Sequence, residues 1–185
     1  MAEVMECLQQ AGAQLCDIPQ PESFVPGYAA HRIIMRVEAA AVHDDLFKQH
    51  RDLYRPHIRS FIESGMVIPG VQYVRAQRLR RRLQRELAPH LAQVDALLTP
   101  TTSTPAPYGL HATGDPALQM PWTFLGIPAL TLPSGLADNG LPLGVQLASA
   151  PFTEARLLAV ARWCERRLGF TARPALVQDT LITRS

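Results

Sequence analysis

Histidine, a frequent metal ligand, recurs every seven residues at His43, His50 and His57. Zinc sites usually place two ligands one helical turn apart, at positions i and i+4, with a third nearby. On one helix, His43 and His50 would lie about 10 Å apart along the axis, too far to chelate the same ion. Pro56 also interrupts the segment before His57. The pattern therefore predicts no metal site.

Hydrolytic chemistry needs a nucleophile with an activating base within hydrogen-bond reach. The sequence contains no Gly-x-Ser-x-Gly motif. Ser134 follows an apolar run, but no histidine or lysine stands near it, so we interpret it as a turn residue. Lys48, the only lysine, could activate a serine only if the fold brought a distant one to it. We therefore predict no catalytic residue within these 185 residues.

Arginine is concentrated between residues 75 and 85, at Arg75, Arg78, Arg80, Arg81, Arg82 and Arg85. Nucleic-acid binding would combine such a basic face with aromatic residues or a docking motif. Here Leu79, Leu83 and Leu87 form one helical stripe, and the arginines fill the opposite side. We interpret this side as a solvated helix face and predict no nucleic-acid partner, with DNA binding as the weaker alternative.

Composition indicates one domain, since 185 residues with 47% hydrophobic side chains can form a substantial core. No apolar run approaches the roughly 18 residues of a membrane span, and residues 1–15 lack the layout of a secretory signal. The three cysteines have no Cys-x-x-Cys spacing, which favours reduced thiols. We expect a cytoplasmic protein with no membrane partner and no cofactor.

Hydrophobic periodicity predicts a first half that is mainly helical. Helices are expected over residues 2–11, 29–50, 56–62 and 71–88, with a proline-rich loop at 19–28. Gly12 should end the first helix, and Gly65 should break the third. Residues 13–19, a short apolar run stopped by Pro19, are expected to form a strand.

Strands dominate the expected second half. Residues 95–98 are expected to form a short buried strand before a loop rich in proline at 99–107. The runs 127–133 and 141–149, joined by Asp138-Asn139-Gly140, predict an antiparallel pair. An amphipathic helix is expected over 153–168. This mixture of helices and strands predicts an α/β fold.

Four segments in this order carry a family resemblance: VDALLTPTTSTPAP, PWTFLGIPALTLPSG, GLPLGVQLAS and EARLLAVARWCERRLGF. Together they resemble the C-terminal signature of the amidase-signature family. The upstream segments LQQAGAQLCDIPQP and ESGMVIPGVQYVRAQRLRRRL resemble the family's preceding elements. The resemblance therefore extends over practically the whole chain and is confined to the family's second half.

The resemblance implies an α/β/α sandwich with a mixed β-sheet, and hydrolysis of carbon–nitrogen amide bonds. The family uses a Ser–cis-Ser–Lys triad, with oxyanion donors supplied by a loop rich in glycine and serine. None of these motifs occurs in residues 1–185, and by the family's layout they would precede Met1. Residues 1–185 are thus expected to be the C-terminal part of an amidase domain whose N-terminal catalytic part is missing.

The resemblance also implies a wall of the substrate pocket, in the segment before the Gly-x-Pro-Ala strand. Its candidate substrate-binding residues are Gln119, Trp122, Thr123 and Phe124. The two aromatic residues would contact the acyl part of a small-molecule amide, and Thr123 could donate or accept a hydrogen bond. Both aromatic residues could instead belong to the core.

Two departures from the family's glutamine-using members, the aminoacyl-tRNA amidotransferases, favour a general amidase. Ser60 and Phe61 stand near the position of an arginine in those members, and Asp115 is one residue away from the position of an acid. A different class of function also remains open. The chain could be a non-catalytic remnant or binding module that pairs with an N-terminal half or with itself through an exposed sheet edge.

Overall fold

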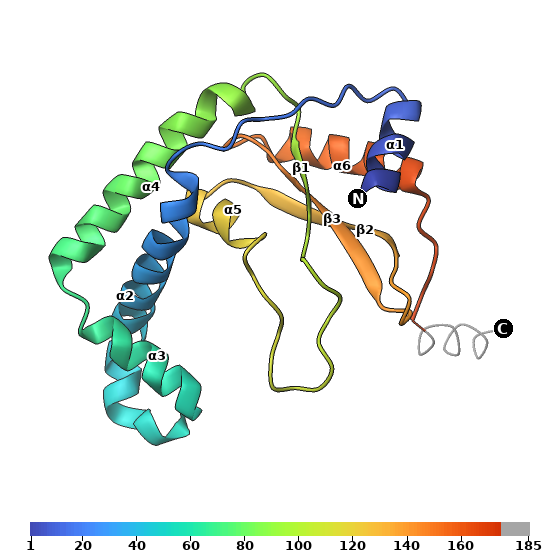
Figure 1. Ribbon diagram of the computed structural model, residues 1–185. Coiled ribbons are helices and arrows are strands. Elements are labelled where there is room, and N and C mark those ends of the chain that lie inside the picture. The colour runs from blue at the N-terminus through green and yellow to red at the C-terminus, as the bar shows by residue number, and fades with distance from the viewer. Residues whose placement is uncertain (175–185) are drawn as a thin grey trace.

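The computed structural model describes residues 1–174, in which a helical first half is followed by strands and two further helices (Figure 1). In chain order the elements are α1 (Ala2–Gln10), α2 (Phe24–His50), a short 3₁₀ turn (Arg51–Leu53), α3 (Pro56–Met66), α4 (Gly70–Leu91), β1 (Leu97–Pro100), α5 (Met120–Leu125), β2 (Ala129–Leu136), β3 (Pro142–Ala148) and α6 (Glu154–Leu168). Helices α2, α3 and α4 form one side of the molecule, and α5 lies between them and the sheet (Figure 1).

The sheet has the strand order β1-β3-β2, with β3 in the middle. Helices α1 and α6 cover one face, and α5, backed by α2 and α4, covers part of the other. This layering confirms the predicted α/β class. The resemblance implied a mixed sheet, whereas all pairing among residues 1–174 is antiparallel. The short loop 137–141 joins β2 to β3 as a hairpin, and β1 runs antiparallel to β3 along its other edge.

Strand register assigns a different chemistry to each face of the sheet. Two rows of residues facing α6 are apolar, namely Leu98–Leu147–Leu130 and Pro100–Val145–Leu132. The opposite face begins with Leu97, Ala148 and Ala129, where Leu97 and Ala148 adjoin the core around α5, and then becomes polar. Successive residues of a strand point to opposite faces, so this division follows from the register alone.

Several predicted elements are confirmed, and others are wrong for identifiable reasons. The β2–β3 pair and α6 match their predictions closely. Residues 13–19 form no strand, because no described strand lies beside them to pair with. Helix α2 begins at Phe24, five residues early, because Pro26 falls in the first turn, where its missing N–H is tolerated. Strand β1 begins at Leu97 and includes Pro100, a shift of two residues.

Gly65 was expected to break a helix, but it lies inside α3. A Cβ atom at this position would overlap the backbone carbonyl of Arg36 and lie 2.9 Å from the Cβ of Ala40, both on α2. Close contact between the two helices therefore depends on the missing side chain. This contact outweighs the intrinsic helix penalty of glycine, which is about 1 kcal/mol.

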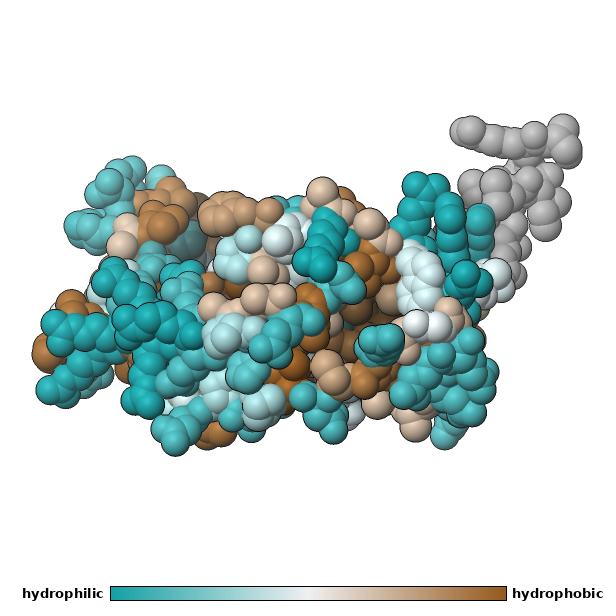
Figure 2. Space-filling view, turned by 90° about the horizontal axis from the view of Figure 1, so that it is seen from above, coloured by the Kyte–Doolittle hydropathy of each residue, from teal (hydrophilic) through white to brown (hydrophobic). Residues whose placement is uncertain are grey.

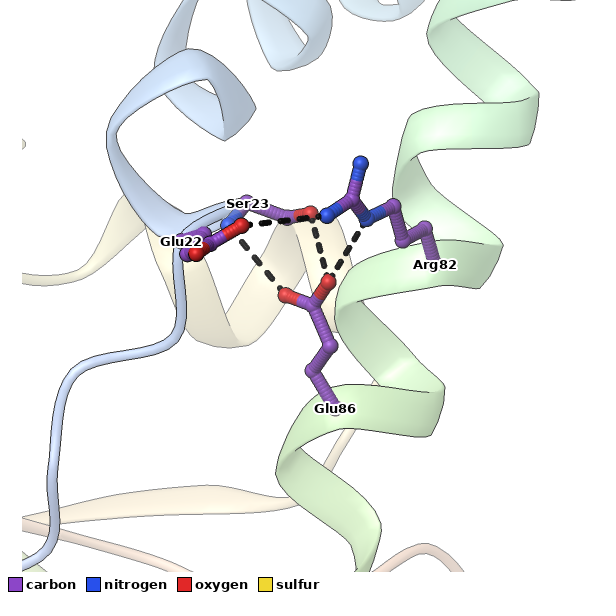
Figure 3. A network of polar contacts seen from close by, with 4 residues as sticks. All are labelled: Glu22, Ser23, Arg82 and Glu86. Atoms are coloured by element: carbon purple, nitrogen blue, oxygen red, sulfur yellow. Dashed lines mark hydrogen bonds and ion pairs between the residues drawn. The ribbon is translucent and has the colours of Figure 1, made fainter.

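A polar network fixes the start of α2 against α4 (Figure 3). Ser23 is buried, and its backbone N–H and hydroxyl donate to the two carboxylate oxygens of Glu86 at 3.2 and 3.0 Å. Arg82 donates from Nε to Glu86 at 2.6 Å and from an Nη to Glu22 at 3.3 Å. The hydrogen bond from Arg82, with those from Ser23, holds the pKa of Glu86 below its ordinary value, against an opposing effect of burial.

The surface of the described residues is mixed in polarity. Seen from above, hydrophobic groups show in the middle of the molecule between more hydrophilic regions (Figure 2). Some large apolar side chains are strongly exposed, among them Val42, Leu53 and Val67. No helix among residues 1–174 combines the length and hydropathy needed to cross a membrane.

Replacing Gly65 by alanine should destabilise the protein, because the new methyl group must push α3 away from α2. We expect Gly65→Ala to lower the free energy of unfolding by about 1–3 kcal/mol in urea titrations. Gly70→Ala is the matched control, since nothing lies within 4 Å of its Cβ position. The control should be neutral or more stable by up to about 1 kcal/mol. Equal effects of the two substitutions would contradict the close packing of α3 on α2.

The Glu86 network should make stability depend on pH. A carboxylate whose pKa is lowered by folding stabilises the native state above its unfolded pKa, about 4.3 for glutamate. That contribution disappears as the pH falls through the lowered pKa of the folded state. The stability difference between the wild type and Glu86→Gln should therefore be largest near neutral pH and shrink below about pH 4. Glu165→Gln, at an exposed site on α6 outside this network, is the control for the loss of one carboxylate.

Candidate functional site

The segment predicted to form the substrate wall folds into the short helix α5. Pro121 lies in its first turn, where a missing N–H is acceptable. The helix ends at Gly126, which adopts a left-handed conformation with φ of 68° and donates its N–H to the carbonyl of Trp122. Glycine adopts this conformation without strain. The Gly-x-Pro sequence thus ends α5 immediately before β2 begins.

The four predicted wall residues lie on two sides of α5. Trp122 and Phe124 are 6% and 3% exposed and belong to the core formed with α2 and α4. Gln119 and Thr123 are exposed. The structure therefore places three of the four residues on α5 and Gln119 at its N-cap, and it separates the polar pair from the aromatic pair.

A small crevice lies between α2 and α5, and Phe124 forms part of its lining together with Tyr28 and His31. Its volume of about 10 Å³ is roughly what a single water molecule needs. The ring of Phe124 contacts His31 edge to face, with the ring centroids 5.9 Å apart. As it stands, this crevice has no room for the acyl part of a substrate.

Two glutamines, which no sequence motif predicted, anchor the ends of α5. Gln84 of α4 donates from Nε2 to the carbonyl of Leu125 at 2.7 Å. Gln146 of β3 donates from Nε2 to the carbonyl of Leu118 at 3.2 Å and is only 5% exposed. A glutamine within an otherwise apolar strand was the available signal for the second anchor. Helix α5 is thus tied both to α4 and to the sheet.

Electrostatic effects near α5 favour uncharged forms of the titratable groups. Burial, reinforced by the nearby Arg80 guanidinium, lowers the pKa of His31, and Glu38 opposes this only in part. Burial and then the negative charge of Asp115 raise the pKa of Tyr28. Both side chains are therefore held in their neutral forms near the crevice.

The other candidate chemical groups form no catalytic arrangement among residues 1–174. The hydroxyl of Ser134 lies 3.4 Å from the carbonyl of Leu143, to which it donates. Lys48 donates a hydrogen bond to Asp44 at 2.7 Å on an exposed part of α2. Nδ1 of His43 lies 3.0 Å from the hydroxyl of Tyr54. Within the same residues, no cluster of histidine, cysteine and acidic side chains could hold a metal ion.

Residues that bear on the choice between types of amidase lie on α3 and in the loop before α5. Ser60 and Phe61 lie on α3, where the Arg36 guanidinium stands 5.9 Å from the centre of the Phe61 ring. Asp115 accepts the backbone N–H of Ala117 at 3.0 Å in the loop. Neither position contributes a side chain to the crevice beside α5.

The arginine-rich helix α4 has the predicted orientation. Leu83 and Leu87 are buried, and most of the arginines are exposed or half-buried on the other side of the helix. The leucine stripe therefore packs into the core, as its helical spacing predicted.

Comparison with known proteins identifies the family of this chain. A family model described as Amidase matches residues 1–158. The chain belongs to the amidase-signature family. It is 31% identical over 94% of its length to a glutamyl-tRNA(Gln) amidotransferase subunit of Granulibacter bethesdensis. It is also 31% identical over 72% of its length to an amidase of Pseudomonas putida. The predicted family resemblance is confirmed.

Solved structures give the same result for the fold of this amidase-family chain. The crystal structure of an amidase superimposes with a TM-score of 0.82 over 91% of the chain, at 29% identity. The match spans 41% of that amidase, and the chain likewise spans 41% of the Granulibacter relative. The chain therefore corresponds to less than half of these longer proteins.

The anchor from Gln146 can be tested through stability. Gln146→Leu keeps the approximate shape of the side chain but leaves the carbonyl of Leu118 without its donor. We expect the free energy of unfolding to fall by about 1–3 kcal/mol. Gln93→Leu, at an exposed position after α4, should change it by no more than about 0.5 kcal/mol. Equal effects in urea unfolding would show that the anchor contributes nothing.

Proposed function

We propose that this chain forms the substrate-wall and scaffold portion of an amidase that hydrolyses carbon–nitrogen amide bonds. The observation that carries the proposal is the Amidase match over residues 1–158. The family's Gly-Gly-Ser-Ser-Gly-Gly run occurs nowhere in the 185 residues. In this proposal the Ser–cis-Ser–Lys triad comes from a polypeptide segment outside this sequence. Its lysine and bridging serine deprotonate a nucleophilic serine, which forms an acyl-enzyme.

The proposed contribution of the present chain is to position the substrate. Gln119 and Thr123 offer polar groups from the exposed side of α5. Trp122 and Phe124 serve the acyl part from the apolar side of α5, where the crevice lined by Phe124 must widen to admit it. The two glutamine anchors keep this wall at a fixed place relative to α4 and the sheet. Fixed positioning matters because acyl transfer depends strongly on the alignment of the reacting atoms.

We further propose a general amidase acting on a small-molecule amide in the cytoplasm, without a nucleic-acid or membrane partner. The matches include a protein named simply as an amidase. Arg82 forms ion pairs with Glu22 and Glu86. These ion pairs support the interpretation of the arginine side of α4 as a solvated face and not a nucleic-acid-binding surface. The described cysteines are free thiols, as reducing surroundings require.

A second candidate is a non-catalytic module that pairs with another chain. Within residues 1–174, β1 and β2 each pair only with β3, so each has an outer edge with no strand beside it. Such edges can accept a strand from an N-terminal half or from a second copy. Under this alternative the chain would assemble with a partner without supporting hydrolysis.

The first proposal can be tested by complementation. The purified 185-residue chain should hydrolyse no simple amide, because loss of a triad costs on the order of 10⁶-fold in rate. Co-expression with an N-terminal segment of an amidase relative that carries the Gly-Ser-Ser motif should give measurable hydrolysis. Ser134→Ala should leave that activity unchanged. Assembly without hydrolysis would favour the non-catalytic module.

The opposite outcome would overturn the proposal directly. If the chain alone released ammonia or an amine from an amide, and substitution of one of its own serines abolished this, the nucleophile would lie within these residues. Ser134→Ala is the first substitution to make, because Ser134 lies on β2, the strand that directly follows α5.

A further inference from the structure

One arginine of α4 lies on the inner side of the helix, apart from the exposed arginines. Buried Ala76 precedes Arg80 by four positions, and buried Leu83 and Leu87 follow it by three and seven. At these spacings all four residues share one side of a helix. An Nη atom of Arg80 adjoins Gly126 at the end of α5, where an added Cβ would lie 2.9 Å from it. The guanidinium therefore fits beside α5 because Gly126 has no side chain.

The guanidinium of Arg80 has no ion pair or hydrogen bond among residues 1–174. Its Nε is buried without a partner, although the side chain as a whole is only half-buried. Glu38, on the facing helix α2, instead accepts hydrogen bonds from Tyr73 at 3.0 Å and Gln77 at 3.4 Å. An arginine keeps its charge in a protein, and burying a charge without a partner is costly. The described residues thus leave the charge of Arg80 uncompensated.

Arg36 has the same incomplete bonding but different surroundings. Its Nε is also buried without a partner, yet its guanidinium lies over the ring of Phe61, 5.9 Å from the centroid. The face of an aromatic ring is negative and attracts a cation. Arg80 has no such ring beneath it among residues 1–174. Compensation for its charge must therefore come from an anion that these residues do not provide.

The surroundings of Arg80 are open to a ligand and carry a single positive charge. Among its guanidinium nitrogens only Nε is fully enclosed, so the two Nη groups can meet an incoming group. Neighbouring His31 adds no charge, because burial and the Arg80 guanidinium lower its pKa. The planar fork of a guanidinium matches the two oxygens of a carboxylate, which carries one negative charge. A doubly charged phosphate would leave one charge uncompensated.

We propose that Arg80 is a binding site for a carboxylate, which its Nη groups hold beside Gly126. Two sources offer this chemistry: an acidic side chain of the polypeptide segment that completes the enzyme, and the acid group of a small ligand. The inference goes beyond amide hydrolysis, since an acidic side chain of a partner would fill the site equally well in a non-catalytic module. The absent counter-charge of Arg80 is the observation that carries it.

Acetate binding to the complete 185-residue chain tests the site. Acetate should produce a saturable shift of the Arg80 Nε–H signal in ¹H–¹⁵N spectra, whereas acetamide, its neutral match, and chloride at equal ionic strength should not. Bound acetate should also raise the pKa of His31, because it cancels the positive charge that lowers this pKa. Arg80→Gln should weaken acetate binding at least about tenfold, the usual effect of losing a charged hydrogen bond. Arg80→Lys, which keeps the charge but loses the fork, should give an intermediate affinity.

Arg81→Gln, at the exposed neighbouring position, is the matched control and should leave acetate binding unchanged. An equal loss in this control would overturn the inference. Equal shifts with acetamide or chloride, or a pKa of His31 that acetate does not change, would overturn it as well.

The assembly with an N-terminal segment of an amidase relative distinguishes the two sources. If acetate no longer binds in the assembly and the pKa of His31 is already raised, a side chain of that segment fills the site. If acetate still binds there, the carboxylate belongs to a small ligand. Acetate binding at Arg80 without hydrolysis in the assembly would contradict the amidase proposal alone. Hydrolysis without any effect of acetate at Arg80 in the isolated chain would contradict this inference alone.

Discussion

The pairing of β3 with both β1 and β2 is the interaction on which the rest of the structure depends. It sets which side chains face α6 and which face α5. Because the register aligns Leu98, Leu147 and Leu130 in one row, that face must be covered, and α6 and α1 cover it. The same register aligns Thr99, Gln146 and Thr131 on the opposite face, where Thr131 is exposed. A slip of one residue would exchange the two faces and bury these polar side chains under α6.

Elements determined by local sequence could be predicted, and elements determined by distant contacts could not. The β2–β3 pair follows from two apolar runs around Asp138-Asn139-Gly140, and α6 from its stripe of buried residues. Gly65 is different, because its place inside α3 depends on the backbone of Arg36 on another helix. Residues 13–19 have the composition of a strand but no described partner, and a strand exists only by pairing.

In the candidate site, too, features set by local sequence could be predicted and features set by distant contacts could not. The resemblance placed the proposed substrate wall at the segment that forms α5, but six residues give too little periodicity to assign faces. Trp122 and Phe124 face the core only because α2 and α4 pack on that side of α5. Gln84 lies 41 positions from the residue whose carbonyl it binds, and Gln146 lies 28 positions away from its own partner. Such contacts become visible only in the fold, although a glutamine inside an apolar strand could have indicated one of them.

These contacts also explain how a chain without a visible nucleophile could still determine specificity. In the proposed amidase, a helix anchored at both ends keeps its backbone in place, so the rearrangement needed on binding is confined to the side chains that line the crevice. Catalysis requires preorganised groups around the reacting atoms, and these can come from two segments if each is rigid. The buried hydroxyl of Thr99 has no partner among the described residues, and Gln146 uses its Nε2 on the carbonyl of Leu118. Apolar side chains at these two positions would remove a buried polar group and an anchor of α5, while the strands would still pair through their backbones.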